Sequence, residues 1–386
     1  MALPFVRLGG SYALFFAVMG LLAPYWGPYL REQGYDAAAI GILIAIVHAT
    51  KIIAPNLWGW IADHTGQRIV VIRVACAFAS VGFLGVFLDG GFLWMALVMT
   101  TFSFFWNATL PQLEALTFSH LHTDTHRYPR IRLWGTVGFM AAVLLGGEAI
   151  DLYGAGVVPM MIMGLMLALV LLSLTLPATQ PVARHEDHHG LWRILSARPV
   201  VGLFLACFLL QASHGPFYAF YSIYLQDYGY SGLSIGLLWA VALTAEILVF
   251  LLMPRWLPRI GPRRLLLAAM LLAVLRWVLV ATFAHSPIIQ AFAQLLHAAT
   301  YGVYHATAIS LVNRYFTGHL QGRGQALYSS LTFGAGVALG SYLAGMLWQP
   351  IGGVGTYYLA AMIAGLGGLV AFWMVAGDDR PAVSRA

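Results

Sequence analysis

The feature that most constrains this chain is a succession of apolar runs that follow one another over almost the whole sequence. A helix needs about 20 apolar residues to cross the hydrocarbon core of a bilayer. By that measure the sequence predicts twelve spanning helices, at residues 11–31, 38–60, 69–88, 91–118, 132–150, 156–176, 199–225, 232–254, 264–284, 287–312, 324–347 and 354–376. A content of 60% hydrophobic and 9% charged residues excludes a soluble surface. We therefore expect an all-α integral membrane protein.

The longest polar segment, residues 177–198, divides the predicted helices into six and six. We expect an N-terminal half at 1–176, a linker at 177–198 and a C-terminal half at 199–386. The linker contains His185, Glu186, Asp187, His188 and His189, which could bind a metal, but their irregular spacing favours a flexible polar connection. The two cysteines, Cys76 and Cys207, lie inside apolar runs and suggest neither a disulfide nor a metal site. We expect no cofactor.

Arginines follow the predicted helices on one side of the membrane. That side includes Arg7, Arg68, Arg73, Arg130, Arg193, Arg264 and Arg314, while the other side has Arg31 with Glu32, Asp36, Asp89, Asp151 and Asp227. By the positive-inside rule, both termini and the linker are cytoplasmic, in the inner (plasma) membrane. Because the basic residues are spread between apolar runs and do not form a patch, nucleic acid is not an expected partner.

A short motif follows the second predicted helix. In WGWIADHTGQR (58–68), Gly59, Asp63, Gly66 and Arg68 stand in a fixed spacing, with Gly66 placed for a tight turn. The motif recurs 195 residues later as MPRWLPRIGPR (253–263), without the acid. Internal repeats are typical of transporters whose halves rock around a central site. We expect Asp63 and Arg68 to form a one-sided cytoplasmic latch that bridges helices of the two halves.

With twelve helices, a central linker and this loop motif, the chain resembles the major facilitator superfamily. It looks closest to the phenylpropionate permease subfamily, which is related to the lactose/proton symporter. The stretches that carry this resemblance are YPRIRLWGTVGF (128–139), LLQASHGPFYAFYSIYLQDYGYS (209–231), GLLWAVALTAEILVF (236–250) and LLAVLRW (271–277). The resemblance implies an organic acid as substrate.

Single residues also match the symporter pattern. Glu114 and Arg132 resemble its substrate-binding charge pair, and Phe139 takes the place of an aromatic residue that stacks on the ligand. Arg276 and His297 resemble the arginine and histidine of its coupling centre. One departure matters, because Thr300 stands where the symporter has its proton-carrying glutamate. If protons drive this protein, another group must carry them.

Two cations are predicted to lie deep in the membrane. Lys51 is twelve residues from Asp63, which places it ~18 Å from the cytoplasmic end of its helix. Arg276 is twelve residues from Arg264 and so shares that depth in the other half. One cation in each half suits a carboxylate held between the halves. The alternative is that Lys51 pairs with an internal acid.

Titratable groups on two helices are candidates for proton coupling. Glu246 and His305 are each nine residues from a cytoplasmic arginine and occupy one layer. A buried carboxylate or an imidazole can take up and release a proton near neutral pH. We expect Glu246 to be the coupling site, with His297 as the second choice. Alternatively, Glu246 permanently neutralises Arg276.

A set of polar and aromatic side chains follows one face of the seventh helix. Gln211, His214, Tyr218 and Tyr221 are spaced by three and four residues. Such a face could stack on and hydrogen-bond an aromatic acid. His214 could equally be a satisfied polar group in helix packing.

The leading hypothesis is a monomeric secondary transporter that takes up a small organic anion, such as a 3-phenylpropionate-like carboxylate, with protons. The alternative within transport is a proton symporter of a neutral sugar or nucleoside, supported by Glu114 and Arg132. Drug efflux is a third reading. A membrane-embedded enzyme that uses His297 and His305 lacks a nucleophile motif, a phosphate loop or metal-ligand spacing. We therefore expect no enzymatic activity.

Overall fold

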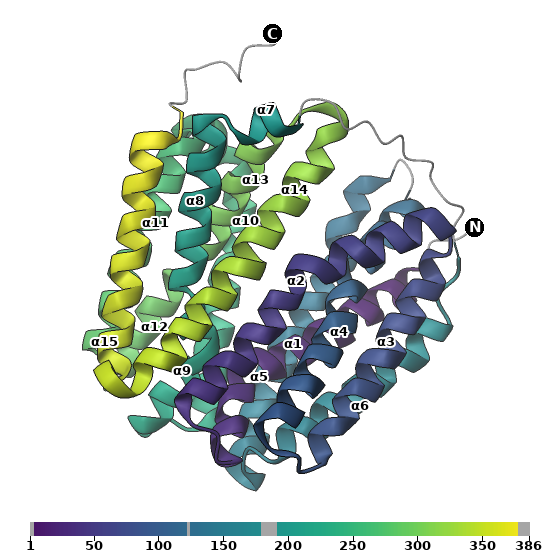
Figure 1. Cartoon of the computed structure of the whole chain (residues 1–386), viewed down its shortest axis with the longest axis vertical. Coiled ribbons are helices and arrows are strands. Elements are labelled where there is room, and N and C mark those ends of the chain that lie inside the picture. The colour runs from purple at the N-terminus through teal and green to yellow at the C-terminus, as the bar shows by residue number, and fades with distance from the viewer. Residues whose placement is uncertain (1–3, 122–123, 179–190, 377–386) are drawn as a thin grey trace. The chain divides into compact units, whose positions relative to one another are not determined.

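The computed structural model describes residues 4–121, 124–178 and 191–376, and these are almost entirely helical (Figure 1). The helices are α1 (Phe5–Glu32), α2 (Ala37–Thr65), α3 (Arg68–Leu84), η1 (Gly85–Phe87), α4 (Gly91–Leu121), η2 (Thr125–Arg127), α5 (Tyr128–Tyr153), α6 (Val157–Leu174), α7 (Leu191–Leu195), α8 (Arg198–Ser213), α9 (Gly215–Asp227), α10 (Gly232–Ile260), α11 (Pro262–Thr282), α12 (Pro287–Leu295), η3 (Ala298–Val303), α13 (Tyr304–Tyr315), η4 (Gly318–Leu320), α14 (Gln321–Ser329), η5 (Ser330–Gly336) and α15 (Val337–Met374). Of the short elements, η3 and η5 are π-helical.

The predicted membrane-spanning helices are present. Within the described ranges, ten continuous segments are long and apolar enough to cross a bilayer. One of them, Gln321–Met374, holds two crossings because Gly352, with a φ of 71°, interrupts the helix. The run from α12 through η3 to α13 supplies another crossing. The all-α fold with twelve spans is therefore confirmed. The predicted linker histidines fall in 179–190, outside the described residues.

Contacts divide the chain into two units, Met1–Arg184 with Tyr221–Leu237, and His185–Phe220 with Leu238–Ala386. The predicted boundary places Tyr221–Leu237 in the C-terminal half, whereas its contacts group it with the first unit. The Asp151 carboxylate accepts hydrogen bonds from the backbone N–H groups of Gly232 (2.6 Å) and Leu233 (2.9 Å). These bonds satisfy donors at the start of α10, which otherwise have no intrahelical partner.

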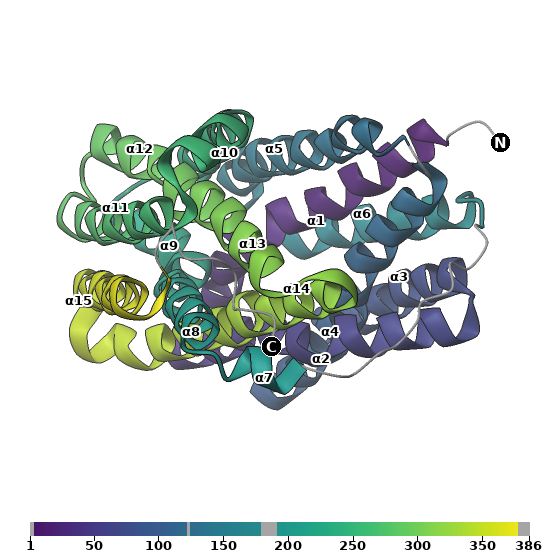
Figure 2. The ribbon, with the colours of Figure 1, turned by 90° about the horizontal axis from the view of Figure 1, so that it is seen from above.

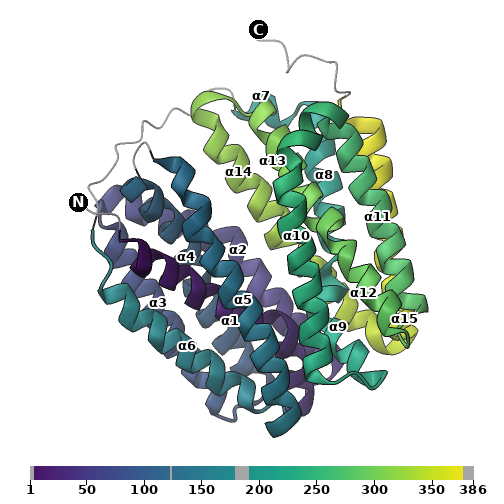
Figure 3. The same cartoon turned by 180° about the vertical axis from the view of Figure 1, so that it is seen from behind.

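The first unit is built on close packing of α1 against α5, with α6 on the other side of α1 (Figures 2 and 3). A Cβ atom on Gly138 would lie 2.1 Å from the carbonyl oxygen of Ala13. Only glycine therefore permits this approach of the two backbones, as expected where helices associate in lipid through small residues.

Helices of the second unit also pack closely at glycines. Its α15 runs beside α8 and α11 (Figure 1). A Cβ on Gly340 would lie 2.0 Å from the carbonyl oxygen of Ala212, and one on Gly215 would lie 2.1 Å from the carbonyl carbon of Gly340. Pro216 follows at the break between α8 and α9, where it cannot donate an intrahelical hydrogen bond.

Arginines cap the C-terminal ends of α6 and α15 in the same way. In the first unit, Arg73 donates to the carbonyl oxygens of Ser173, Leu174 and Leu176, at 3.0–3.2 Å. In the second unit, Arg263 donates to the carbonyl oxygen of Phe372 at 2.6 Å. Terminal carbonyls of a helix lack intrahelical donors and favour a nearby cation. These arginines therefore stabilise the C-terminal ends of the two helices.

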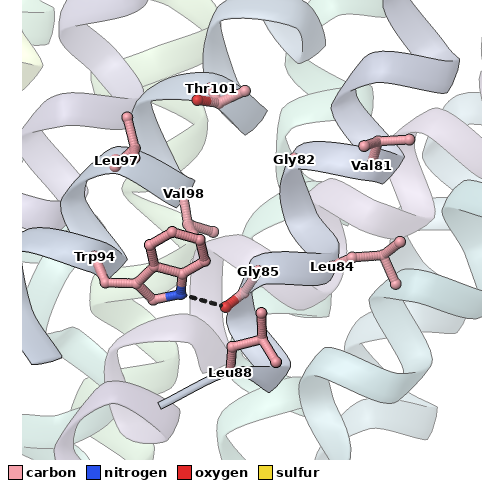
Figure 4. A pocket seen from close by; sticks show the side chains of 9 residues that line it. All are labelled: Val81, Gly82, Leu84, Gly85, Leu88, Trp94, Leu97, Val98 and Thr101. Atoms are coloured by element: carbon pink, nitrogen blue, oxygen red, sulfur yellow. Dashed lines mark hydrogen bonds between the residues drawn. The ribbon is translucent and has the colours of Figure 1, made fainter. Parts of the chain in front are cut away.

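Large apolar side chains cover the surface, as expected of a protein surrounded by lipid. A groove of about 480 Å³ lies between α3, η1 and α4. Figure 4 shows the side chains that line it, Leu84, Leu88 and Leu97 among them. Trp94 lies at its edge and donates from Nε1 to the carbonyl oxygen of Gly85 at 2.8 Å. The groove contains none of the predicted site residues, so the candidate site lies elsewhere.

Candidate functional site

The loop motif forms a compact turn in the first unit. Gly66 ends α2 in the left-handed conformation, with a φ of 66°, which a side chain would strain. Arg68, at the start of α3, donates to the Asp63 carboxylate at 2.5 Å. Gly59 faces α4, where an added Cβ would lie 3.6 Å from Nε2 of Gln112. The motif thus joins the ends of α2 and α3 through an ion pair.

Lys51 lies in the middle of α2 and is half-buried. Within the described part of the chain its ammonium group has no hydrogen bond or ion pair. An unpaired cation at this depth is costly, at ~2.5–3.5 kcal/mol on insertion scales. The alternative in which an internal acid neutralises Lys51 therefore has no support from its contacts.

The residue before Lys51 is held by a polar network that the sequence reasoning missed. Thr50 donates to the hydroxyl of Ser103 at 2.9 Å. Asn107 donates to Thr50 Oγ1 at 2.9 Å and to the carbonyl oxygen of Val47 at 3.0 Å. Ser103 and Asn107 are buried and lie four residues apart on α4. This spacing of polar residues in an apolar helix was the available signal, and the network fixes α2 where it carries Lys51.

Glu114 and Arg132 lie in one region of the first unit but contact different partners. Glu114 accepts a hydrogen bond from the Tyr128 hydroxyl at 3.2 Å. The Arg132 guanidinium lies over the Phe16 ring, 3.9 Å from its centroid, and 5.8 Å from that of Tyr12. The region therefore offers a carboxylate, a guanidinium and three aromatic rings. Phe139 lies two turns further along α5 and is half-buried.

Arg276, on α11, is fully buried in the second unit. It donates to Thr300 Oγ1 and to Gln294 Oε1, each at 3.2 Å. The rings of Phe217 and Trp277 lie on it, with centroids 4.5 and 4.4 Å from the guanidinium carbon. Thr300 stands where the lactose/proton symporter has a glutamate, and here it accepts a hydrogen bond from the Arg276 guanidinium.

Glu246 lies next to this cluster. Its Oε2 is 3.8 Å from Nε2 of His297. An added Cβ on Gly302 would lie 3.3 Å from Glu246 Cγ, so the glycine lets the acid side chain pack onto η3. The structure therefore brings two of the predicted coupling residues together in the second unit, and an added proton would convert them into a charged hydrogen-bonding pair.

His305, the third predicted coupling residue, lies eight residues beyond His297. The ring of Tyr301 stands between them, nearly parallel to both, at centroid distances of 5.3 and 6.1 Å. Nδ1 of His305 is 3.1 Å from the hydroxyl of the buried Tyr328. His305 therefore belongs to an aromatic cluster and lies outside the Glu246–His297 pair.

The predicted face of the seventh helix spans the break between α8 and α9. Gln211, His214 and Tyr221 are fully buried, and Tyr218 is half-buried. His214 contacts the carbonyl oxygen of Leu210 through Nδ1 (2.8 Å) and lies 3.4 Å from Thr300 Oγ1 through Nε2. His214 therefore contacts the Arg276 cluster through its Nε2 atom.

Comparison with known proteins gives the family. A model described as the MFS_1 like family matches residues 5–359. The chain belongs to this family of major facilitator transporters. As a member of the MFS_1 like family it is a multi-pass membrane transporter and not an enzyme. In the part of the chain that the structure describes, no group of three or more His, Cys, Asp or Glu side chains could hold a metal ion.

Relatives of this MFS_1-like transporter differ in what they carry. It is 28% identical to a probable 3-phenylpropionic acid transporter of Escherichia coli (strain K12), over 92% of this chain and 93% of the relative. It is 27% identical to a maltose permease of Geobacillus stearothermophilus, over 96% and 94%. A crystal structure of the nucleoside transporter NupG has the same fold, with a TM-score of 0.82 at 19% identity, covering 96% of this chain and 98% of that one.

Proposed function

We propose that this transporter takes up a small organic anion together with protons, with aromatic carboxylates favoured. The observation that carries the proposal is Lys51, a half-buried cation in a membrane span with no protein partner among the described residues. A substrate carboxylate would provide that partner. The similarity to a probable 3-phenylpropionic acid transporter supports the same substrate class.

The two deep cations have different surroundings. Arg276 is fully buried and is bound by Gln294 and Thr300, with rings on its flanks. Lys51 is half-buried, and within residues 4–121, 124–178 and 191–376 no side chain or backbone group pairs with its ammonium group. Lys51 is therefore the first-choice anchor for the anion, and Arg276 organises the polar interior of the second unit.

Proton coupling is assigned to Glu246 and His297. The 3.8 Å separation of their side chains would let them share a proton. Protonation changes the net charge of this pair inside a membrane span, which is the property that a coupling site needs. Since Thr300 cannot titrate, Glu246 is the acid that this arrangement offers.

A neutral sugar or nucleoside is the second candidate substrate. The region of Glu114, Tyr128 and Arg132 in the first unit combines hydrogen-bonding groups with the aromatic rings of Phe16 and Tyr12. Such a combination suits a hydroxyl-bearing ring. The similarity to a maltose permease supports this candidate. For either substrate, we propose that the protein lies in the inner membrane as a monomer, with both termini on the cytoplasmic side.

A thermal-shift screen of the purified transporter separates the two candidates. The panel contains aromatic and aliphatic carboxylates, their amides, maltose and uridine, and each is applied to the wild type and to Lys51→Gln. We expect carboxylates to raise the melting temperature of the wild type and to lose this effect in Lys51→Gln. Stabilisation by maltose or uridine, with no response to any acid, would reject the anion proposal.

A further inference from the structure

An aromatic cluster in the second unit is not accounted for by the proposed coupling site. Its members are Tyr301, His305, Tyr328 and Phe333. The Phe333 ring centroid lies 5.9, 5.6 and 5.9 Å from those of Tyr301, His305 and Tyr328. These distances are typical of favourable edge and offset ring contacts. Tyr328 is buried, while the other three are half-buried.

The cluster is built where two neighbouring helices change their winding. Tyr301 lies in the π-helical η3 and Phe333 in the π-helical η5, and Figure 2 shows the adjoining α13 and α14 next to each other. Such π-helical turns are rare and occur frequently at functional sites, because the extra residue redirects side chains.

Polar side chains lie on the accessible side of this cluster. The half-buried stripe that begins with Tyr301 in η3 and His305 in α13 continues through Ile309 to Asn313. On α14 it is matched by Gln325, which donates to Asn313 Oδ1 at 2.8 Å, and by the exposed Ser329. The bond between Gln325 and Asn313 joins the two helices, as polar side chains in membrane spans commonly do. The half-buried rings of Tyr301, His305 and Phe333 keep an accessible edge beside these polar side chains.

His305 presents one nitrogen on this surface. Its Nδ1 is engaged by the Tyr328 hydroxyl at 3.1 Å. Its Nε2 has no hydrogen-bond partner in the described ranges of the chain, and an imidazole nitrogen can either donate or accept. Stacking against Tyr301 and contact with Phe333 hold the ring in place. The arrangement offers two aromatic rings and one fixed polar atom to a ligand.

We infer that Tyr301, His305 and Phe333 form a ring-binding subsite that selects an aromatic acid with a hydroxyl group on its ring. The ligand ring contacts Tyr301 and Phe333, and Nε2 of His305 hydrogen-bonds the ring hydroxyl. Tyr328 is a positioning residue, because it acts only through Nδ1 of His305. This inference refines the proposed anion transport by naming the substrate's second recognition element.

The test compares ring-substituted ligands on purified transporter. Calorimetry measures binding of 3-phenylpropionate, its meta- and para-hydroxy derivatives, and the amides of all three. We expect the wild type to bind one hydroxy derivative about 2- to 10-fold more tightly than the unsubstituted acid, as one net hydrogen bond provides. His305→Phe retains an aromatic ring and should abolish this preference, by weakening the hydroxy derivative more than 3-phenylpropionate. His285→Phe, at an exposed position outside the helices, is the matched control and should bind as the wild type does.

The outcomes separate this subsite from anion transport. If acids bind in a Lys51-dependent manner but His305→Phe keeps the hydroxyl preference, or weakens all acids equally, the subsite is wrong and anion transport stands. If only the amides bind, with a preference that depends on His305, the subsite stands and the anion proposal fails. Absence of a His305-dependent preference in both series overturns the subsite. Tyr328→Phe should reduce the preference partially.

Discussion

Replacement of Lys51 tests whether the lone cation in α2 exists to bind an anion, and it should act in opposite directions on stability and on binding. Without ligand, the ammonium lies half-buried with no partner among the described residues, so Lys51→Met should raise the melting temperature. The gain is bounded by the ~2.5–3.5 kcal/mol cost of a cation at the centre of a bilayer, and partial exposure makes it smaller.

With ligand, the same residue should be the main source of affinity for a carboxylate. A hydrogen bond to a charged group contributes ~1.5–3 kcal/mol, which corresponds to about 10- to 150-fold in the dissociation constant. Lys51→Met and Lys51→Gln should therefore weaken 3-phenylpropionate binding by this factor. They should leave binding of 3-phenylpropionamide nearly unchanged, because the amide carries no charge for the ammonium to pair with.

Calorimetric titration of the wild type and the variants with both ligands provides the measurement. Lys51→Arg is the charge-preserving control and should retain a preference for the acid over the amide, although the larger guanidinium fits differently. If the variants lose affinity for acid and amide equally, Lys51 supports the structure of the site and does not recognise charge. A lower melting temperature of ligand-free Lys51→Met would show that the ammonium already has a stabilising partner, which refutes the reasoning.

Three further predictions concern coupling, gating and packing. Glu246→Gln should abolish substrate accumulation driven by a pH gradient yet retain exchange of labelled for unlabelled substrate in proteoliposomes; persistent gradient-driven accumulation would exclude Glu246 as the coupling acid. Asp63→Asn breaks the ion pair with Arg68 and should slow uptake at least several-fold with little change in the dissociation constant, whereas equal losses in both would place Asp63 in binding. Gly138→Val should prevent accumulation of folded protein, as judged by size-exclusion chromatography, because its Cβ would clash with the backbone of α1. Gly164→Val, where no atom lies within 4 Å of the added Cβ, should fold normally, and equal behaviour of the two variants would contradict the close-packing argument.

The fold could be predicted from the sequence because the thickness of the bilayer sets the length of a spanning helix. Apolar runs of the required length gave twelve spans, and the repeated loop at 58–68 and 253–263 indicated two related halves. What hydropathy could not show is where a span is interrupted. The π-helical turns η3 and η5 have no local sequence pattern that specifies them, whereas Pro216 was an available signal for the break at His214.

The candidate site could be predicted in part. Membrane charges such as Lys51, Arg276 and Glu246 are visible in the sequence because they are rare and costly there. Their partners were less visible. Gln294 and Thr300 bind Arg276 from another span, so the pairing needs the tertiary structure. The same holds for Tyr328, which looked like an ordinary helical residue until its hydroxyl was placed beside His305.

Uptake of 3-phenylpropionate into proteoliposomes tests the central claim most directly. The purified transporter is reconstituted, a pH gradient is imposed across the membrane, and labelled acid is followed with and without a protonophore. The account predicts accumulation that the protonophore abolishes and that Lys51→Gln reduces at least about tenfold. Equal uptake by wild type and Lys51→Gln, or accumulation that persists without a proton gradient, would contradict it.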